Sequence, residues 1–238
     1  MTEHGEGLQR VDHGFGPLYD HASRILFLGT MASPASRRHG FFYMHPRNRF
    51  WPVMEALFAD RADPTDRVGL SVQSRRAFAL RHRIALWDAI ESCDIRNASD
   101  ASIRNVVPSD LAPIINGSQI NHIYTCGAKA TALYHRYCEP NLAEQGITLP
   151  ATALPSTSPA YAAATLGDLI TAYRARIDWN AYRTPVVDGV GRRPTHRICW
   201  SAVRWRPAAQ PCVRRRLRHP AHHSSQALHS KHTAQERR

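Results

Sequence analysis

A short apolar run, Ile25 to Leu28, constrains the fold of this chain more than any other feature. It is apolar at every position and ends at Gly29, as expected of a strand that is buried on both faces of a parallel sheet. We therefore expect a strand over 24–30. Three later segments have similar strand character, at 83–88, 120–126 and 148–154.

Helices are expected between these strands. The alternation of strand and helix predicts an α/β fold, a three-layer α/β/α sandwich around a central parallel sheet with right-handed crossovers. In such a fold the loops at the carboxyl ends of the strands meet at one edge, where ligands bind. The expected helices lie at 47–59, 72–82, 109–116, 127–138 and 160–179.

Two segments follow the first strand and hold a dense set of small, polar and aromatic residues. Gly29 to Pro34 is a small-residue loop, and Gly40 to Trp51 is rich in aromatic and polar side chains. Pro46 fits the first turn of a helix, which places Asn48 near the positive end of the helix dipole, where a water or an anion is favoured. On pattern grounds alone, an aromatic core helix fits the second segment equally well.

A third segment, Leu154 to Ala162, joins the last strand to the last helix. Together with the first two segments it resembles the uracil-DNA glycosylase superfamily and, within it, the DNA-deoxyinosine (hypoxanthine-DNA) glycosylases. Gly29 to Ser33 occupies the place of the first family motif. Tyr43 to Trp51 matches a tyrosine, histidine-proline, asparagine-arginine-phenylalanine-tryptophan signature, and Leu154 to Ala160 matches the second motif.

Weaker similarities at Ile84–Asp88 and Gly127–Ala130 extend this resemblance over roughly residues 20 to 180. The chain departs from the superfamily pattern at Met31, where many relatives have Asp or Asn to orient the attacking water. It also departs at Ala32, where a proline is usual, and at Cys126, where relatives tend to have Asn. Deoxyinosine glycosylases share the first departure.

The resemblance implies a role for each matched residue. Asn48 takes the work of orienting the water, and the ring of Tyr43 stacks on the flipped base. His45 donates a proton to the leaving purine or, alternatively, caps the helix. The base-binding residues are Gly29, Thr30, Met31 and Tyr43.

Ser156, Thr157 and Ser158 form a hydroxyl-rich loop between two prolines, suited to phosphate oxygens of the DNA strand. Ser158-Pro159 also reads as an ordinary helix N-cap and first residue. Lys129, near a helix start, is a further phosphate candidate or a solvated lysine. Asp88, at the end of a strand, is interpreted as structural.

Most of the positive charge lies in the last quarter of the chain. The formal net charge is +12, but residues 184–238 hold 12 Lys and Arg against Asp188 and Glu236, which leaves +2 for residues 1–183. We expect this tail to be disordered. It is either a nonspecific DNA-binding arm with salt-dependent affinity or a frameshifted read-through without a selected role, and Trp200 and Trp205 favour the second hypothesis.

The cysteines and the hydropathy set further expectations. The five cysteines include no C-x-x-C pair, so neither a structural zinc nor an iron–sulfur site is expected. Their odd number, with no signal peptide and no apolar run of membrane length, predicts a reducing cytoplasmic setting, the bacterial cytosol or nucleoid. The motifs imply no cofactor, no metal and no membrane partner.

We expect a loose lead-in over residues 1–20, a glycosylase domain over 21–183 and the tail over 184–238. The resemblance implies a monomeric, monofunctional glycosylase that removes a deaminated base, hypoxanthine first, from double-stranded DNA, with single-stranded DNA left open. Uracil is the alternative base. A non-catalytic nucleic-acid-binding relative is a second alternative, and a nucleotide-binding α/β domain is a third, although G-x-G-x-x-G and the Walker pattern are missing.

Overall fold

Four parallel strands form the centre of the structure, a computed structural model that describes residues 7–96 and 99–183. The strand order is β3-β2-β6-β7, and every neighbouring pair is parallel. This sheet confirms the four predicted strands. They are β2 (Ile25–Gly29), β3 (Ile84–Asp88), β6 (His122–Cys126) and β7 (Ala151–Leu154).

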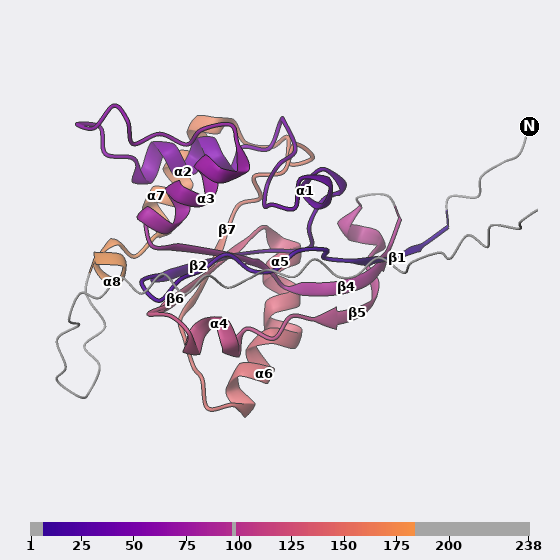
Figure 1. The fold of residues 1–238 in the computed structure, drawn as a ribbon. Helices are drawn as coiled ribbons and strands as arrows, with labels where there is room; N and C mark the ends of the chain where they lie inside the picture. The colour runs from indigo at the N-terminus through magenta and orange to yellow at the C-terminus, as the bar shows by residue number, and fades with distance from the viewer. Residues whose placement is uncertain (1–6, 97–98, 184–238) are drawn as a thin grey trace, which may run out of the picture. The chain divides into compact units, whose positions relative to one another are not determined.

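Helices cover both faces of this sheet, which confirms the predicted three-layer α/β/α sandwich (Figure 1). One face carries α2 (Phe50–Phe58), α3 (Val72–Arg81) and α7 (Leu166–Arg176). The other carries α4 (Ala112–Asn116), α5 (Ala128–Leu133) and α6 (Glu139–Glu144), the last two joined by a π turn at Tyr134–Cys138. A short α8 (Trp179–Arg183) follows α7.

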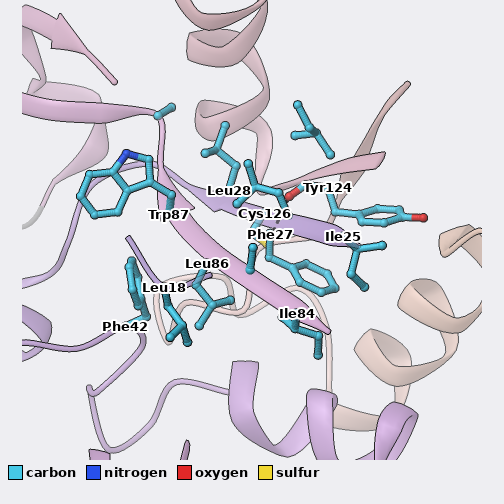
Figure 2. Close-up of a cluster of buried hydrophobic side chains, with 14 of the residues drawn as sticks. Leu18, Ile25, Phe27, Leu28, Phe42, Ile84, Leu86, Trp87, Tyr124 and Cys126 are labelled. Atoms are coloured by element: carbon cyan, nitrogen blue, oxygen red, sulfur yellow. Dashed lines mark hydrogen bonds between the residues drawn. The ribbon is translucent and has the colours of Figure 1, made fainter. Parts of the chain in front are cut away.

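The core lies on and between the central strands. All five residues of β2 are buried, as are all five of β3 and of β6. Phe27 makes ring contacts with Phe50 and Phe58 of α2 and with Tyr173 of α7, so this strand holds the helical layer directly. Figure 2 shows these strands' apolar side chains packed together, with Leu18 beside Leu86.

A second, antiparallel sheet was not predicted. It has the order β1-β4-β5, with β1 (Gln9–Asp12), β4 (Ile90–Ile95) and β5 (Arg104–Pro108). Two of its strands, β1 and β5, are mostly exposed, so they lack the apolar run that identifies the central strands. β4 begins only two residues after β3 ends, which places this sheet next to the carboxyl edge of the central one.

The amino-terminal segment differs from the loose lead-in expected over 1–20. From Gln9 it pairs with β4, and Leu18 forms backbone hydrogen bonds in both directions with Leu86. His13 and Leu18 are buried, so this segment belongs to the packed structure. The predicted tail, 184–238, lies outside the described residues.

Two predicted helix starts are wrong, and side-chain hydrogen bonds explain both. Asn48 precedes α2, because its Oδ1 accepts from the Phe50 backbone N–H at 2.9 Å, and Pro46 lies in a turn. The last long helix begins at Leu166, where Thr165 and Asp168 form a capping box, so Ser158-Pro159 is a turn and not the helix cap.

A helix directly after the first loop was not expected. α1 (Pro34–His39) follows Ser33, whose side chain accepts from the Ser36 backbone N–H, and Pro34 stands in its first turn. The signal was present in the sequence, since Ser-Pro is a common helix start. This helix turns the small-residue loop into one wall of the site described next.

Candidate active site

A cavity of about 540 Å³ opens at the carboxyl edge of the central sheet. Three strands end at its wall, with Gly29, Asp88 and Cys126. Most of the predicted site residues line it, although they come from segments more than a hundred residues apart. They are Gly29, Thr30, Met31, Tyr43, His45, Asn48, Ser156, Thr157 and Ser158. Lys129, in the first turn of α5, is not among the lining residues.

Tyr43 is held by its backbone, by its ring and by burial of its hydroxyl. Its φ of 55° lies in the left-handed region, which non-glycine residues rarely adopt. One ring face stacks on Phe50 at 3.8 Å between centroids, and the residue lines the cavity. The buried hydroxyl points toward Gly29, and burial raises the pKa of Tyr43 well above its ordinary value. The side chain is therefore an uncharged, fixed aromatic wall.

Asn48 lines the cavity just before α2. The hydrogen bond from the Phe50 N–H to its Oδ1 fixes the side-chain amide, which leaves the two N–H donors of Nδ2 and one lone pair of Oδ1 for a ligand. An amide has no useful pKa, so this group can orient a water molecule but cannot deprotonate it. The aromatic neighbours Phe50 and Trp51 are core residues, as the core-helix interpretation of this segment expects.

His45 also lines the cavity, within the turn that precedes Asn48. Its Nδ1 accepts a hydrogen bond from the Arg47 backbone N–H at 3.2 Å. An accepting Nδ1 places the proton of the neutral ring on Nε2. His45 therefore caps a turn and not the start of a helix. Its other ring nitrogen, Nε2, keeps an N–H that can donate.

The remaining predicted base-binding residues form the first loop. The Thr30 hydroxyl donates to the Asp100 carboxylate at 3.3 Å, and Met31 packs partly buried against the core. Met31 carries no group that could orient a water, as expected where the chain departs from the superfamily pattern. A Cβ added to Gly29 would lie 2.1 Å from Asp88 Oδ1, so the close approach of that carboxylate requires a glycine here.

The loop from Ser156 to Thr165 is fastened to the Asn48 segment by Arg49. The Arg49 guanidinium donates to the carbonyls of Ser158 at 2.8 Å and Tyr161 at 2.6 Å, and to that of Ala164. The Arg49 backbone N–H donates to the Thr157 carbonyl at 3.1 Å. Because one planar group satisfies three carbonyls, it joins the two sides of the cavity.

The hydroxyl groups of this loop are unequally exposed. Ser156 and Ser158 are half-buried and accept from backbone N–H groups two residues further on, which leaves their hydroxyl protons free to donate. Thr157 is buried. Phosphate contacts by these residues stay a prediction, with Ser156 and Ser158 the better placed.

Cys126 lies at the end of β6 with its thiol buried beside the Tyr43 and Tyr173 hydroxyls. Burial raises the pKa of Cys126 to about 12. The side chain is therefore a neutral thiol throughout the physiological range, and its Sγ donates to the Tyr124 backbone carbonyl at 3.9 Å, at the position where relatives tend to have Asn.

We expect Cys126 to resist alkylation in the folded protein. A thiol whose pKa rises from 9.0 to about 12 has a thiolate fraction roughly 10³-fold lower near pH 8, and only the thiolate reacts. Iodoacetamide labelling followed by peptide mass spectrometry, with and without denaturant, measures this. Rapid native labelling of Cys126, at the rate seen in denaturant, would contradict the buried placement.

Further charged side chains at the cavity were not predicted as site residues. Asp88, interpreted as structural, faces the cavity, and its Oδ2 lies 2.6 Å from the Nε2 of the buried His13. Its position at a strand end on the ligand-binding edge was the available signal. Arg38 and Arg47 are exposed at the cavity wall, and guanidinium groups in such a place suit phosphate oxygens.

Among the residues that the structure describes, no group of three or more His, Cys, Asp and Glu side chains could hold a metal ion. Within the same residues, no helix has both the length and the apolar character needed to span a membrane.

Comparison with solved structures defines the class of fold. The chain is similar to a solution NMR structure from Methanosarcina acetivorans of a protein provisionally assigned as a uracil DNA glycosylase, with a TM-score of 0.54 and 22% sequence identity. The similarity covers 70% of this chain and 98% of that one. This chain therefore shares its α/β fold with that protein, which confirms the fold expected from the resemblance.

Comparison with curated proteins finds a relative whose sequence matches part of this chain. The chain is 28% identical over 92 residues to a hypoxanthine DNA glycosylase of Methanosarcina barkeri (strain Fusaro / DSM 804). The match covers 39% of this chain and only 55% of that relative's length. The expected resemblance to a hypoxanthine DNA glycosylase is therefore confirmed over this stretch of the chain. No protein-family model matches the chain.

Proposed function

We propose that this protein is a DNA glycosylase that takes a deaminated base out of the duplex and hydrolyses its N-glycosidic bond. The observation that carries this proposal is the single cavity in which both motif segments meet, with Asn48 and Tyr43 in its wall. Its volume of about 540 Å³ is in the range of small-molecule sites. Hypoxanthine is the first choice of base, in line with the name of the Methanosarcina barkeri relative.

The cavity residues divide the reaction between them. Tyr43 offers its free ring face to the flipped base, since Phe50 already covers the other face. Asn48 orients a water toward the sugar carbon, where positive charge develops as the bond to the base breaks. The Nε2 proton of His45 supports the departure of the purine. Ser156 and Ser158 hold the phosphates of the same strand.

The enzyme we propose is monofunctional, because none of the described residues that line the cavity is a lysine that could form a Schiff base with the sugar. Its product is then an abasic site that breaks only in alkali. It acts on double-stranded DNA as a monomer in the cytoplasm and needs no cofactor.

The test is base release by the full chain from matched oligonucleotides that carry deoxyinosine, deoxyuridine or a G·T mismatch, read by strand cleavage after alkali. Release from the deoxyinosine duplex above the other two is expected. Preferred release from deoxyuridine would replace hypoxanthine by uracil. Tight duplex binding without release from any substrate would replace the enzyme by a nucleic-acid-binding protein.

Two substitutions at Tyr43 separate its ring from its hydroxyl. Tyr43→Phe keeps the stacking face and removes only the buried hydroxyl, so we expect its base-release rate to stay within about threefold of the unsubstituted protein. Tyr43→Ala removes the ring and is expected to weaken transition-state binding by about 1–3 kcal/mol. Single-turnover kinetics on a deoxyinosine duplex measure both. Equal losses in the two variants would assign the contribution to the hydroxyl instead.

A further inference from the structure

A second cavity, of about 400 Å³, is lined by α2, by the start of α3 and by the chain that joins these helices. We call it the α2/α3 groove. None of its lining residues lines the active-site cavity. Its charged groups are Arg61, Arg67 and Arg75 against Glu55, so the lining carries a net positive charge.

The carboxylate of the groove is already used by the protein. Glu55 Oε2 accepts a hydrogen bond from the Val68 backbone N–H at 2.9 Å, and Glu55 Oε1 lies 3.4 Å from Arg67 Nη1. The Arg67 side chain is 60% exposed, so its ion pair with Glu55 is accessible to water. Arg61 is exposed as well. The two exposed guanidinium groups can therefore bond to a further anion.

Arg75 is held by uncharged groups. Its guanidinium carbon lies 5.6 Å from the centroid of the Trp51 ring, its Nε donates to the Gly69 carbonyl at 3.3 Å, and its Nη1 donates to Met44 Sδ at 3.0 Å. Burial lowers the pKa of Arg75 below its ordinary value. None of the ion pairs among the described residues includes Arg75. A half-buried cation without a carboxylate partner favours an anionic group on a ligand.

The same groove has an exposed apolar rim. Leu70 is 88% exposed, more than any other large hydrophobic side chain that the structure describes, and Pro52 is exposed beside the groove's buried Trp51. A single exposed leucine is ordinary, but a leucine at the edge of a concave, cationic groove suits an apolar side chain of a ligand. DNA phosphates would use the arginines alone and leave this rim in water.

We propose that the α2/α3 groove binds an acidic segment of a partner protein that carries apolar side chains among its carboxylates. The carboxylates pair with Arg61, Arg67 and Arg75, because a planar guanidinium can bond both oxygens of one carboxylate. An apolar side chain of the segment packs against Leu70. This inference does not depend on the proposed function, since the groove and the active-site cavity have separate linings.

The test measures binding of a fluorescein-labelled synthetic peptide of aspartates interrupted by leucines to the full chain, by fluorescence anisotropy. We expect saturable binding that weakens as salt is added, because exposed ion pairs are screened. The double variant Arg61→Glu/Arg67→Glu is expected to bind the peptide at least ~10-fold more weakly, since two attractive contacts become repulsive. A peptide with serine in place of leucine should lose at least ~10-fold in affinity for the unsubstituted protein.

The basic residues of 184–238 also attract an acidic peptide, so a matched control is needed. Arg174→Glu/Arg176→Glu makes the same change of charge at two exposed arginines in the last turn of α7, outside the groove. We expect its peptide affinity to stay within about threefold of the unsubstituted protein. Thermal unfolding of both double variants shows whether they are folded.

Three results would overturn the proposal. The first is equal binding of the leucine and serine peptides by the unsubstituted protein, which is decisive even if a groove variant fails to fold. The second is an equal loss in the two double variants, which would attribute binding to net charge. The third is unchanged peptide binding with weaker binding of undamaged duplex by Arg61→Glu/Arg67→Glu alone, which would make the groove a DNA contact. Absence of base release would refute the proposed function and leave these binding results unaffected.

Discussion

Replacing Asn48 by alanine is expected to lower the rate of hypoxanthine release by at least ~10²-fold while duplex binding persists. The reason is that the Asn48 amide is held by the Phe50 N–H and faces the cavity, so it is pre-oriented for a water molecule. Loss of one such oriented contact in a transition state costs about 10²–10³ in rate. Single-turnover release and a duplex-binding isotherm measure the two quantities separately.

A capping control is needed, because Asn48 also satisfies a backbone donor at the start of α2. Asn48→Ser retains a side-chain oxygen for the Phe50 N–H, so we expect it to unfold at nearly the temperature of the unsubstituted protein. It lacks the amide and should lose release as severely as Asn48→Ala. A serine variant with normal release would mean that the cap, and not the chemistry, is the role of Asn48.

The second large effect is expected at Arg49. Arg49→Ala removes a guanidinium that bonds three carbonyls of the 156–165 loop, and hydrogen bonds to a charged group contribute about 1.5–3 kcal/mol. We expect the free energy of unfolding to fall by about this amount and base release to fall by at least ~10-fold, because Ser156 and Ser158 lose their position. Denaturant titration and single-turnover kinetics measure the two effects.

Two companion variants make this expectation specific. Arg49→Lys keeps the charge but cannot bond three carbonyls with a planar fork, so it should recover little. Arg176→Ala removes an exposed arginine at the end of α7 and should change neither quantity. If Arg49→Lys proved as stable and active as the unsubstituted protein, charge alone would explain the role of Arg49.

The strands β2 and β3 could be predicted from the sequence because their residues are apolar at nearly every position. Ile25 to Leu28 and Ile84 to Trp87 are buried throughout, so the apolar run and the burial coincide. β1 and β5 lack this signal, since pairing with β4 stabilises them and their side chains stay largely exposed.

The starts of helices were harder to predict. At each of them the sequence fits both a helix start and a turn, and a local side-chain hydrogen bond decides which one forms. Pro46 and Ser158-Pro159 both have the form of a helix start, yet the chain continues in turns at both. Asn48 and Thr165 provide the competing bonds. Such competition depends on geometry that residue order does not specify.

The site residues also divide into those that the sequence identifies and those that only the fold brings together. Tyr43, His45 and Asn48 were found because they are close in sequence and match a motif, and the structure places all three at one cavity. His13 matches no motif and lies 75 residues from Asp88, so only the fold brings the two together. Lys129, selected because it stands near a helix start, is not among the cavity residues.

The most direct test of the proposed function is chromatographic detection of free hypoxanthine after incubation of the full chain with a deoxyinosine duplex. We expect one free hypoxanthine for each abasic site formed, with strand breaks only after alkali and almost no release by Asn48→Ala. Strand cleavage without free hypoxanthine, or equal release by Asn48→Ala, would contradict the proposed function.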